Sequence, residues 1–352
     1  MRTMKAFYRG ALLAWLLVAS CAAAGANGSS AAVLAPPQHR RGTEQTFLTF
    51  PEWFLVFSPA EYAAYVKDHV PTDFPFIGHI RQFWQSYRAV YRASNDGYPF
   101  NFGYHVMIVV IGTSTTVEYA LRSAYETLIG RMSGLTATHG LTEEDRFGAV
   151  VAQDYVDFIR VLPWYEYDFK DKLIKLWKET AWWGPDALRK WERKYALTTE
   201  YGIKAVYGWL IKKATKASYD APLLVTAVVV DNLPADPRMD LPDLKILRRL
   251  PDGSALILVP RYDAFMRYAF VLARRGSNFQ EIAGNRSIIL VSILAPRSWE
   301  GAGNGSEVLF TQPILTQPEL KRVALVVPVA SLAAQLNALG ASGARLEHVF
   351  DY

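Results

Sequence analysis

The spacing of apolar residues changes at about residue 220 of this chain. From about residue 46 to that point they recur every three or four positions, the period of an amphipathic helix, and many are aromatic. Beyond it they form short runs rich in Val, Ile and Leu, separated by Gly, Pro and Asp, which is typical of strands. The change predicts an α+β protein, with an aromatic-rich helical domain over residues 46–220 and an α+β domain over residues 221–352.

Capping patterns place several helices in the first domain. Residues 58–61 (SPAE) have serine, proline and glutamate at the positions preferred at a helix start, and residues 142–145 (TEED) form a second start. Apolar spacing predicts a helix over residues 77–91. Residues 166–217 predict two or three more helices, with one of the breaks around residues 196–198.

Residues 104–121 carry an unbroken apolar run from Val106 to Ile111. A helix that is apolar on all sides lies in a protein core or in a membrane. His105 and Glu118 bracket the run, which is too short to span a bilayer. We therefore expect a buried core helix, and the alternative is a segment over residues 100–121 that inserts into a membrane.

The order of elements in the second part suggests its architecture. Residues 257–260 and 325–328 both end a predicted strand in proline and precede a predicted helix. Two β-α-β halves make a ferredoxin-like α/β sandwich, which we predict here. Residues 231–243 contain three prolines and four aspartates, and they predict either the connection between the domains or a loop inside the second.

The first 21 residues have the layout of an export signal. Arg2, Lys5 and Arg9 are basic, and residues 11–19 (ALLAWLLVA) form an apolar segment too short for a spanning helix. Such a segment can be removed by ordinary signal cleavage, kept as an uncleaved anchor helix, or end in a cysteine that carries a lipid. Residues 22–45 are rich in Ala, Gly, Ser and Pro, which predicts a flexible tether.

Residues 18–21 (VASC) resemble the lipobox of bacterial lipoproteins, a resemblance confined to the signal. It implies that Cys21 is lipidated and becomes the N-terminus. Ala22, which is not aspartate, implies sorting to the outer membrane of the cell envelope, with the chain facing the periplasm. Cys21 is the only cysteine, so an intramolecular disulfide and a cysteine-based zinc site are excluded.

Local motifs for catalysis are missing. The six histidines form no H-x-x-x-H pair, and neither a nucleophile elbow nor a phosphate loop occurs, so we expect no metal and no cofactor. The catalytic candidates are Glu118, Asp154 and His79. Both carboxylates fall on apolar helix faces, where a charge is costly unless it is paired. Arg122 offers Glu118 such a structural partner, and an arginine or a tyrosine hydroxyl could serve Asp154.

Six of the ten tryptophans lie between residues 164 and 209, in a basic region. Residues 170–216 hold 12 Lys or Arg and 5 Asp or Glu, a surplus of seven positive charges. Tryptophan and lysine together favour a membrane boundary or an acidic envelope polymer. The alternative is a solvated basic helix whose tryptophans fill the core. The candidate contact residues are Trp177, Trp182, Trp183, Lys170, Lys175 and Lys178.

Hydrophobic residues make up 51% of the chain and charged residues 20%, which excludes a fully disordered protein. We expect an exported, membrane-tethered envelope protein with a non-catalytic binding or assembly role. Membrane lipid is the expected partner, and nucleic acid is not. The alternatives are an envelope enzyme that uses buried polar residues and an integral membrane protein. The sequence indicates no oligomeric state.

Overall fold

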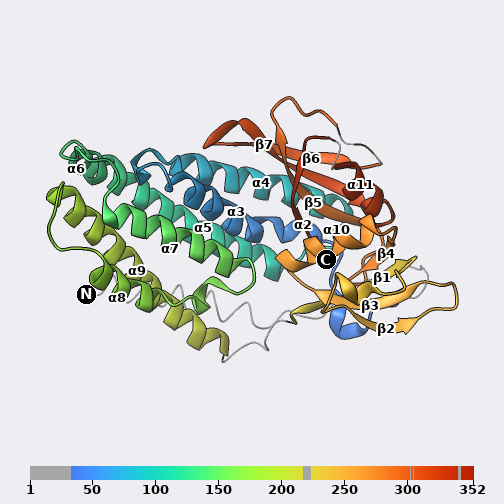
Figure 1. Cartoon of the computed structure of the whole chain (residues 1–352). Coiled ribbons are helices and arrows are strands. Elements are labelled where there is room, and N and C mark those ends of the chain that lie inside the picture. Colours follow the sequence, from blue (N-terminus) through green and yellow to red (C-terminus); the bar gives the residue numbers. More distant parts are fainter. Residues whose placement is uncertain (1–32, 217–222, 302, 304, 340–341) are drawn as a thin grey trace.

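The structure is a computed structural model that describes residues 33–216, 223–301, 303, 305–339 and 342–352 (Figure 1). A bundle of helices comes first in the chain, and two four-stranded antiparallel sheets with two helices follow. The predicted α+β class is confirmed. The predicted signal and Cys21 lie outside the described residues.

The bundle is elongated, and its helices run along the long axis of the molecule (Figure 1). A π-helical turn, Glu126–Gly130, joins α5 to α6, so that these form one continuous rod. The helices are α2 (Gln45–Leu48), α3 (Phe50–Tyr65), α4 (Phe76–Gly97), α5 (Phe102–Tyr125), α6 (Arg131–Gly134), α7 (Glu143–Ile159), α8 (Phe169–Glu179) and α9 (Ala187–Lys216).

One of the two predicted helix starts is confirmed and the other is wrong. Thr142 caps α7 as expected, because its hydroxyl accepts from the Asp145 amide while the Asp145 carboxylate accepts from the Thr142 amide. The start predicted at residues 58–61 is wrong, since α3 begins at Phe50 and continues through Pro59. Buried aromatic side chains before the proline hold α3 against the core, so packing overrides the local signal.

The break predicted around residues 196–198 is also wrong. Helix α9 runs through this segment without interruption. Leu197 is buried in a core shared with α7 and α8, and Thr198 accepts a hydrogen bond from the Trp177 indole at 3.0 Å. Tertiary contacts therefore stabilise a stretch that has weak helix propensity on its own.

The strands form two sheets with the same design. The strands lie side by side in the orders β2-β3-β1-β4 and β6-β7-β5-β8. Along the chain, each sheet contributes three strands, then a helix, then its fourth strand. The first set is β1 (Val225–Asp231), β2 (Lys245–Arg249), β3 (Ala255–Pro260), α10 (Asp263–Arg274) and β4 (Asn278–Ile282). The second is β5 (Ile288–Pro296), β6 (Glu307–Ile314), β7 (Gln317–Pro328), α11 (Leu332–Leu339) and β8 (Arg345–Val349).

The C-terminal part is therefore a repeat of one β-β-β-α-β unit, and Pro260 and Pro328 occupy equivalent positions in it. A ferredoxin-like fold has a single four-stranded sheet, so that finer expectation does not hold. The short polar strand Asn278–Ile282 completes the first sheet, and its composition gave no strand signal. Residues 231–243 connect β1 to β2 within one sheet, so they are a loop inside the second domain.

The two helices of the repeats lie between the sheets. Leu272 of α10 and Leu336 of α11 share one core with inward side chains of both sheets, such as Ile257 and Leu325. Each helix also contacts the last strand of the other repeat, α10 with β8 and α11 with β4. The repeats therefore form three layers in which neither closes its core alone.

The outer face of each sheet is covered by a different part of the chain. The bundle covers the second sheet, where Phe50 and Phe54 pack against Leu290 and Phe350. Residues 33–35 cover the first, and the amides of Leu34 and Ala35 donate to Glu281. Part of the predicted tether therefore packs against the first sheet, whereas residues 22–32 lie outside the described residues.

Helix α5 is not the core helix that its composition predicts. Its buried side chains are few, and they include His105, Ile108 and Tyr119. Gly112 lets α5 approach α4, since a Cβ there would overlap the Phe83 ring. The opposite side of α5 is exposed along its length. The helix lies at the edge of the bundle, where nothing in the described chain covers it.

Candidate functional site

His79 lies at the centre of a buried polar cluster between the bundle and the second sheet. Its Nδ1 is 2.9 Å from Oγ of Ser58 on α3, and this hydroxyl is 2.7 Å from the Tyr119 hydroxyl on α5. Its Nε2 faces Oε2 of Glu61 at 3.6 Å. The Ser-Pro-Ala-Glu motif therefore supplies two members of the cluster, one helical turn apart.

Charges from the sheet complete this His79 cluster. Arg322 of β7 donates to Glu61 at 3.0 Å and to Glu347 of β8 at 2.7 Å and 2.8 Å. Burial raises the pKa of Glu61, which Arg322 opposes. Burial, followed by repulsion from Arg322, lowers the pKa of His79 to about 3, so the imidazole is neutral at physiological pH. Sequence reasoning missed Ser58, Glu61, Arg322 and Glu347.

A β-bulge aims the sheet residues at the bundle. Strand β8 shifts register against β5 near Ser292, so Glu347 and His348 both face the helices. Glu347 accepts from Ser292, and the His348 ring stacks on Trp53 with ring centroids 3.5 Å apart. Both nitrogens of His348 are buried and have no hydrogen-bond partner among the described residues.

The geometry of the His79 cluster resembles a serine–histidine–carboxylate arrangement. However, neither of the two described cavities is lined by Ser58, His79 or Glu61. The cluster joins α3, α4 and α5 to the second sheet, and we interpret it as a structural element.

The other two catalytic candidates, Glu118 and Asp154, pair with the kinds of residue that the sequence suggested as structural partners. Glu118 pairs with Arg122 at 3.2 Å and with Lys204 of α9 at 3.1 Å, and these cations outweigh burial and lower its pKa. Asp154 accepts from the Tyr167 hydroxyl at 2.6 Å and pairs with Lys172 at 2.8 Å. Neither carboxylate is near His79 in the described contacts, so the three candidates form no common site.

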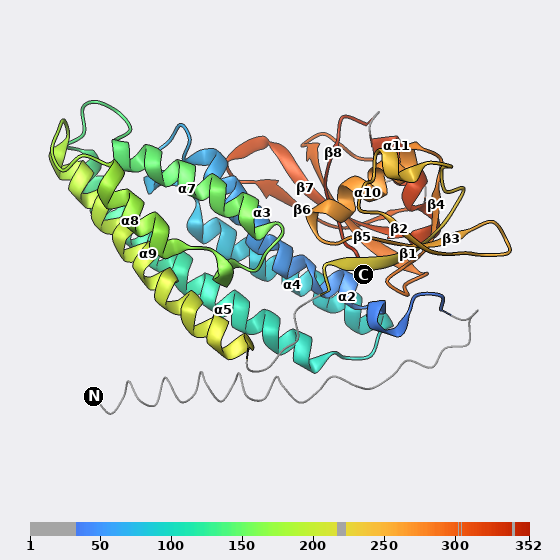
Figure 2. The ribbon, with the colours of Figure 1, turned by 60° about the horizontal axis from the view of Figure 1, so that its bottom comes forward.

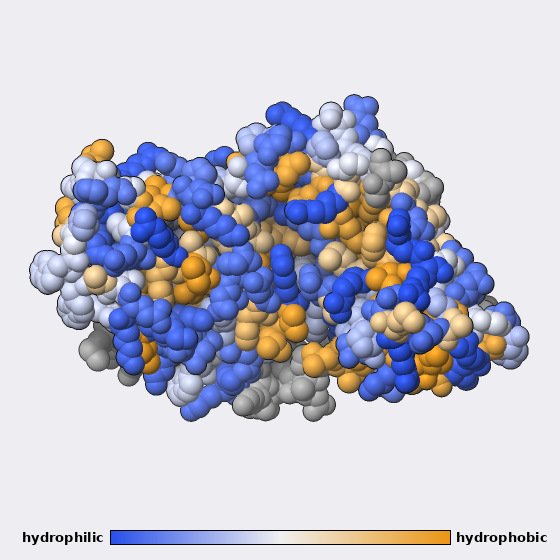
Figure 3. Space-filling model, viewed as in Figure 1, coloured by the Kyte–Doolittle hydropathy of each residue, from blue (hydrophilic) through white to orange (hydrophobic). Residues whose placement is uncertain are grey.

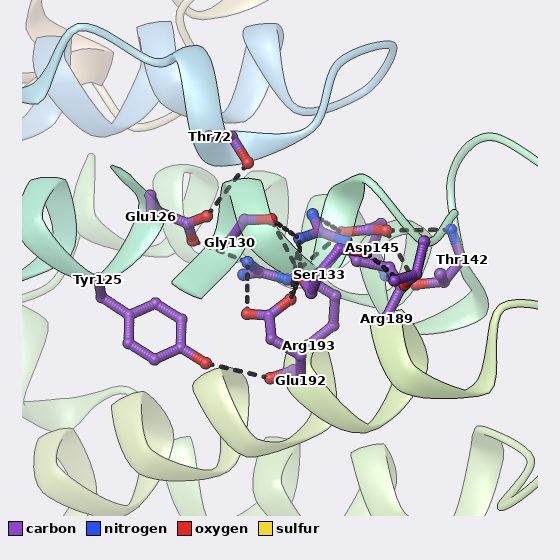
Figure 4. A network of polar contacts seen from close by, with 11 residues as sticks. Thr72, Tyr125, Glu126, Gly130, Ser133, Thr142, Asp145, Arg189, Glu192 and Arg193 are labelled. Carbon is purple, nitrogen blue, oxygen red and sulfur yellow. Dashed lines mark hydrogen bonds and ion pairs between the residues drawn. The ribbon is translucent and has the colours of Figure 1, made fainter. Parts of the chain in front are cut away.

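A second buried network, made of hydrogen bonds and ion pairs, joins α9 to the neighbouring helices (Figure 4). Arg189 donates to the Gly130 carbonyl, to Ser133 and to Glu192, and Arg193 donates to Glu126 at 2.8 Å. The nearest oxygen of Asp145 is 3.6 Å from Arg189 and 3.4 Å from Arg193. The ion pairs connect the π-helical turn, α7 and α9, so they bury the charges of three elements together.

Tryptophans surround a buried lysine near the same end. The ammonium of Lys194 lies 5.3–6.0 Å from the ring centroids of Trp177, Trp182 and Trp191, and it donates to two backbone carbonyls. Of the candidate contact residues, Trp182 and Trp183 are exposed in the loop between α8 and α9. Lys170, Lys175 and Lys178 are exposed on α8.

Acidic residues from outside residues 170–216 meet the positive surplus of that segment. Ion pairs join seven of them to its lysines and arginines: Glu118, Glu126, Glu143, Glu144, Asp145, Asp154 and Glu166. This number equals the surplus counted from the sequence. Ion pairs with these acids therefore offset much of the positive charge of residues 170–216.

Helices α5 and α9 lie side by side and antiparallel (Figure 2). Their charges face each other: Arg122 bonds to Glu200, and Lys204 lies 3.1 Å from Glu118 and 3.0 Å from Glu200. Farther along, the Tyr125 and Tyr195 rings stack at 6.5 Å. This register places Val117 and Ile203 at the same level along the two helices.

The outward sides of the two helices make one apolar surface, which we call the α5–α9 face. Its most exposed members include Leu121 at 67% and Ile203 at 64%. Between Phe102 and Ala124 on α5, and between Tyr195 and Leu210 on α9, the charged side chain most open to water is Glu118, which is 41% exposed and pairs with Arg122 and Lys204. The face consists of Phe102, Val109, Val117, Leu121, Tyr195, Ile203, Val206, Tyr207, Trp209 and Leu210. By comparison, the side of the bundle seen in Figure 3 is mostly hydrophilic.

The chain matches no family model, and no curated protein or solved structure is significantly similar to it. Among residues 33–216 and the described parts of the C-terminal region, no helix has both the length and the apolarity needed to cross a membrane. The same residues contain no group of three His, Cys, Asp or Glu side chains able to hold a metal ion.

Proposed function

We propose that this chain is an exported, lipid-anchored protein of the bacterial envelope, and that its α5–α9 face rests on a bilayer. Its role there is binding or assembly rather than catalysis. The observation that carries this proposal is the apolar outer surface of two adjacent helices, whose residues Glu118, Arg122, Glu200 and Lys204 pair with one another.

This arrangement differs from that of a surface helix in water. In water, the charged side chains of a surface helix lie outside and its apolar stripe faces the core. Here Glu118, Arg122, Glu200 and Lys204 pair between α5 and α9, while Val117 and Ile203 are exposed. Charged groups near hydrocarbon are tolerated when they face the protein interior and pair with one another. The face therefore has the chemistry of a surface that meets lipid.

The dimensions suit a helix pair lying in the interface. Helix α5 has 24 residues, or about 36 Å of length. Interfacial helices sink about 5–10 Å below the headgroups, with aromatic rings at the boundary, and Phe102, Tyr207 and Trp209 can serve this purpose. The attraction is mainly hydrophobic, because ion pairs with acidic residues offset much of the positive charge of residues 170–216.

The predicted acyl group on Cys21 complements such a face. The lipid would tether the chain to the membrane, and the α5–α9 face would add buried apolar area to that attachment. Mass spectrometry of the purified native protein tests the lipid, since an unmodified N-terminus that retains Met1 would contradict lipidation.

Vesicle flotation of the Cys21→Ser protein tests the face without the lipid. We expect it to bind vesicles, and we expect Ile203→Glu or Val117→Glu to lower the partition coefficient at least about tenfold, because a charge in hydrocarbon costs about 2.5–3.5 kcal/mol. The control is Val150→Glu, at a position on α7 that is 70% exposed and lies outside the face. Equal flotation of Ile203→Glu and Val150→Glu would contradict the proposal.

Salt and alkali distinguish the mode of attachment. Binding through the face should persist at an ionic strength of about 1 M, where the Debye length is about 3 Å. Alkaline carbonate should release the Cys21→Ser protein from membranes. Retention after carbonate would instead support insertion of residues 100–121, and loss in salt would support contact through Lys170, Lys175 and Lys178.

A further inference from the structure

A cavity of about 770 Å³ opens at the end of the bundle where α6 is labelled in Figure 1. One wall is the end of α3 with the following turn, residues 65–73, and the other is residues 130–141. Its volume lies in the range of about 300–1,000 Å³ that is typical of small-molecule sites. It shares no residue with the α5–α9 face or with the His79 cluster.

The walls are mainly apolar. Val70, Met132, Leu135 and Leu141 line the cavity, and Tyr65 adds an aromatic ring with His69 stacked on it at 4.5 Å. Leu135, at 88% exposed, leaves almost its whole side chain in water at this opening. A ligand with a long apolar segment would cover these side chains, which is favourable because it removes apolar surface from water.

Polar groups are few and nearly balanced in charge. Arg131 pairs with Asp73 at 3.0 Å at the rim, and Asp68 is a further acid there. Arg189 is 1% exposed and also belongs to the lining. Its Nη1 makes three hydrogen bonds, whereas Nη2 makes none in the described chain and faces Asp145 only at 3.6 Å. A buried donor without a hydrogen-bond acceptor is unfavourable, and Nη2 of Arg189 is such a donor among the residues that line the cavity.

We propose that this cavity binds an acyl chain, with the chain against Val70, Met132, Leu135 and Leu141 and its carbonyl oxygen directed toward Arg189. The acyl group comes from a free fatty acid or from a neutral acyl ester. Both have the apolar chain and the carbonyl oxygen. They differ in charge, because a fatty acid would bring a carboxylate close to Asp68 and Asp73 at the rim and a neutral ester would not.

A binding assay with the full-length Cys21→Ser protein tests this site. The probe is a fluorescent long-chain fatty acid, displaced either by oleate or by mono-oleoylglycerol to distinguish the two sources. We expect saturable binding that Gly134→Phe weakens at least tenfold, because Gly134 lines the cavity with open space around it. The matched control is Gly97→Phe at the end of α4, where a Cβ also meets nothing, and it should bind as the parent protein does.

The outcomes separate this proposal from the membrane face. If both are right, Gly134→Phe loses the fatty acid and still floats with vesicles, while Ile203→Glu shows the opposite pattern. Absence of saturable binding, or equal binding by the Gly134→Phe and Gly97→Phe proteins, would overturn the acyl site and leave the flotation result untouched.

Discussion

Arg322 of β7 donates from Nη2 to Oε1 of Glu61 on α3 at 3.0 Å, although 261 positions separate the two residues in the chain. The same guanidinium holds Glu347 and lies over the Phe57 ring at 4.5 Å. One arginine therefore ties the bundle to the second sheet. Both surfaces are buried there, so the pair belongs to the interior of the protein.

Removing this arginine should destabilise the protein strongly. Arg322→Ala leaves Glu61 and Glu347 buried without their cation, and breaking such a buried pair costs about 3–5 kcal/mol. Urea unfolding measures the loss. The control is Arg345→Ala on β8, where the side chain is exposed and a change within about 0.5 kcal/mol is expected. Similar midpoints for the two variants would show that Arg322 does not tie the two parts together.

Ser58→Ala tests whether the His79 cluster is structural. The substitution leaves Nδ1 of His79 and the Tyr119 hydroxyl without their shared partner, so we expect a loss of about 1–3 kcal/mol in the free energy of unfolding. Ser114→Ala, at an exposed position of α5, should cause no loss. A Ser58→Ala protein that is fully stable but has lost its cellular role would favour the enzyme alternative.

Two glycines of α5 should respond oppositely to the same change. Gly112→Ala drives a methyl group into the Phe83 ring and should destabilise the protein by about 1–3 kcal/mol. Gly103→Ala meets no atom within 4 Å and should stabilise it by up to about 1 kcal/mol, because alanine favours the helix. Thermal unfolding of the two variants compares them directly. A stabilising Gly112→Ala would mean that α4 and α5 pack less closely than described.

Glu52 should make stability depend on pH. Burial raises the pKa of this carboxyl from 4.5 to about 7, although the Tyr104 hydroxyl donates to it. The folded protein holds this proton more tightly than the unfolded chain, so the free energy of unfolding falls as pH rises from 4.5 through about 7. The loss is at most about 3 kcal/mol.

Glu52→Gln mimics the protonated form and should remove that dependence. We expect the variant to match the parent protein at pH 4.5 and to exceed its stability at pH 8. Denaturant titrations at both pH values provide the measurement. Parallel pH profiles for the two proteins would show that Glu52 does not titrate in this window.

The change from helices to strands near residue 220 could be read from the sequence because it depends on local patterns. The cap at Thr142 is local in the same way, since it involves residues 142–145 alone. Strand β4 was not apparent, since five residues with two polar side chains and a glutamate carry little strand signal.

The candidate site depended on contacts that no local pattern records. The basic surplus of residues 170–216 predicted a charged surface, but the acids that pair with it come from α5, the π-helical turn, α7 and the turn at residues 164–166. The signal that could have revealed the α5–α9 face was present, because residues 102–117 lack charge on every side. Interpreting this signal required the tertiary structure, which shows the side of α5 that the other helices leave uncovered.

The change from helices to strands near residue 220 and the cap at Thr142 followed from the sequence by itself, because each arises from interactions among residues close together along the chain. Tertiary structure alone decided that the Ser58 hydroxyl meets His79, that β5 to β8 form a second sheet, and that Glu200 and Lys204 of α9 pair with Arg122 and Glu118 of α5. These outcomes depend on pairings between segments far apart in the chain, and for them packing and burial, rather than local preference, supply the larger free energy.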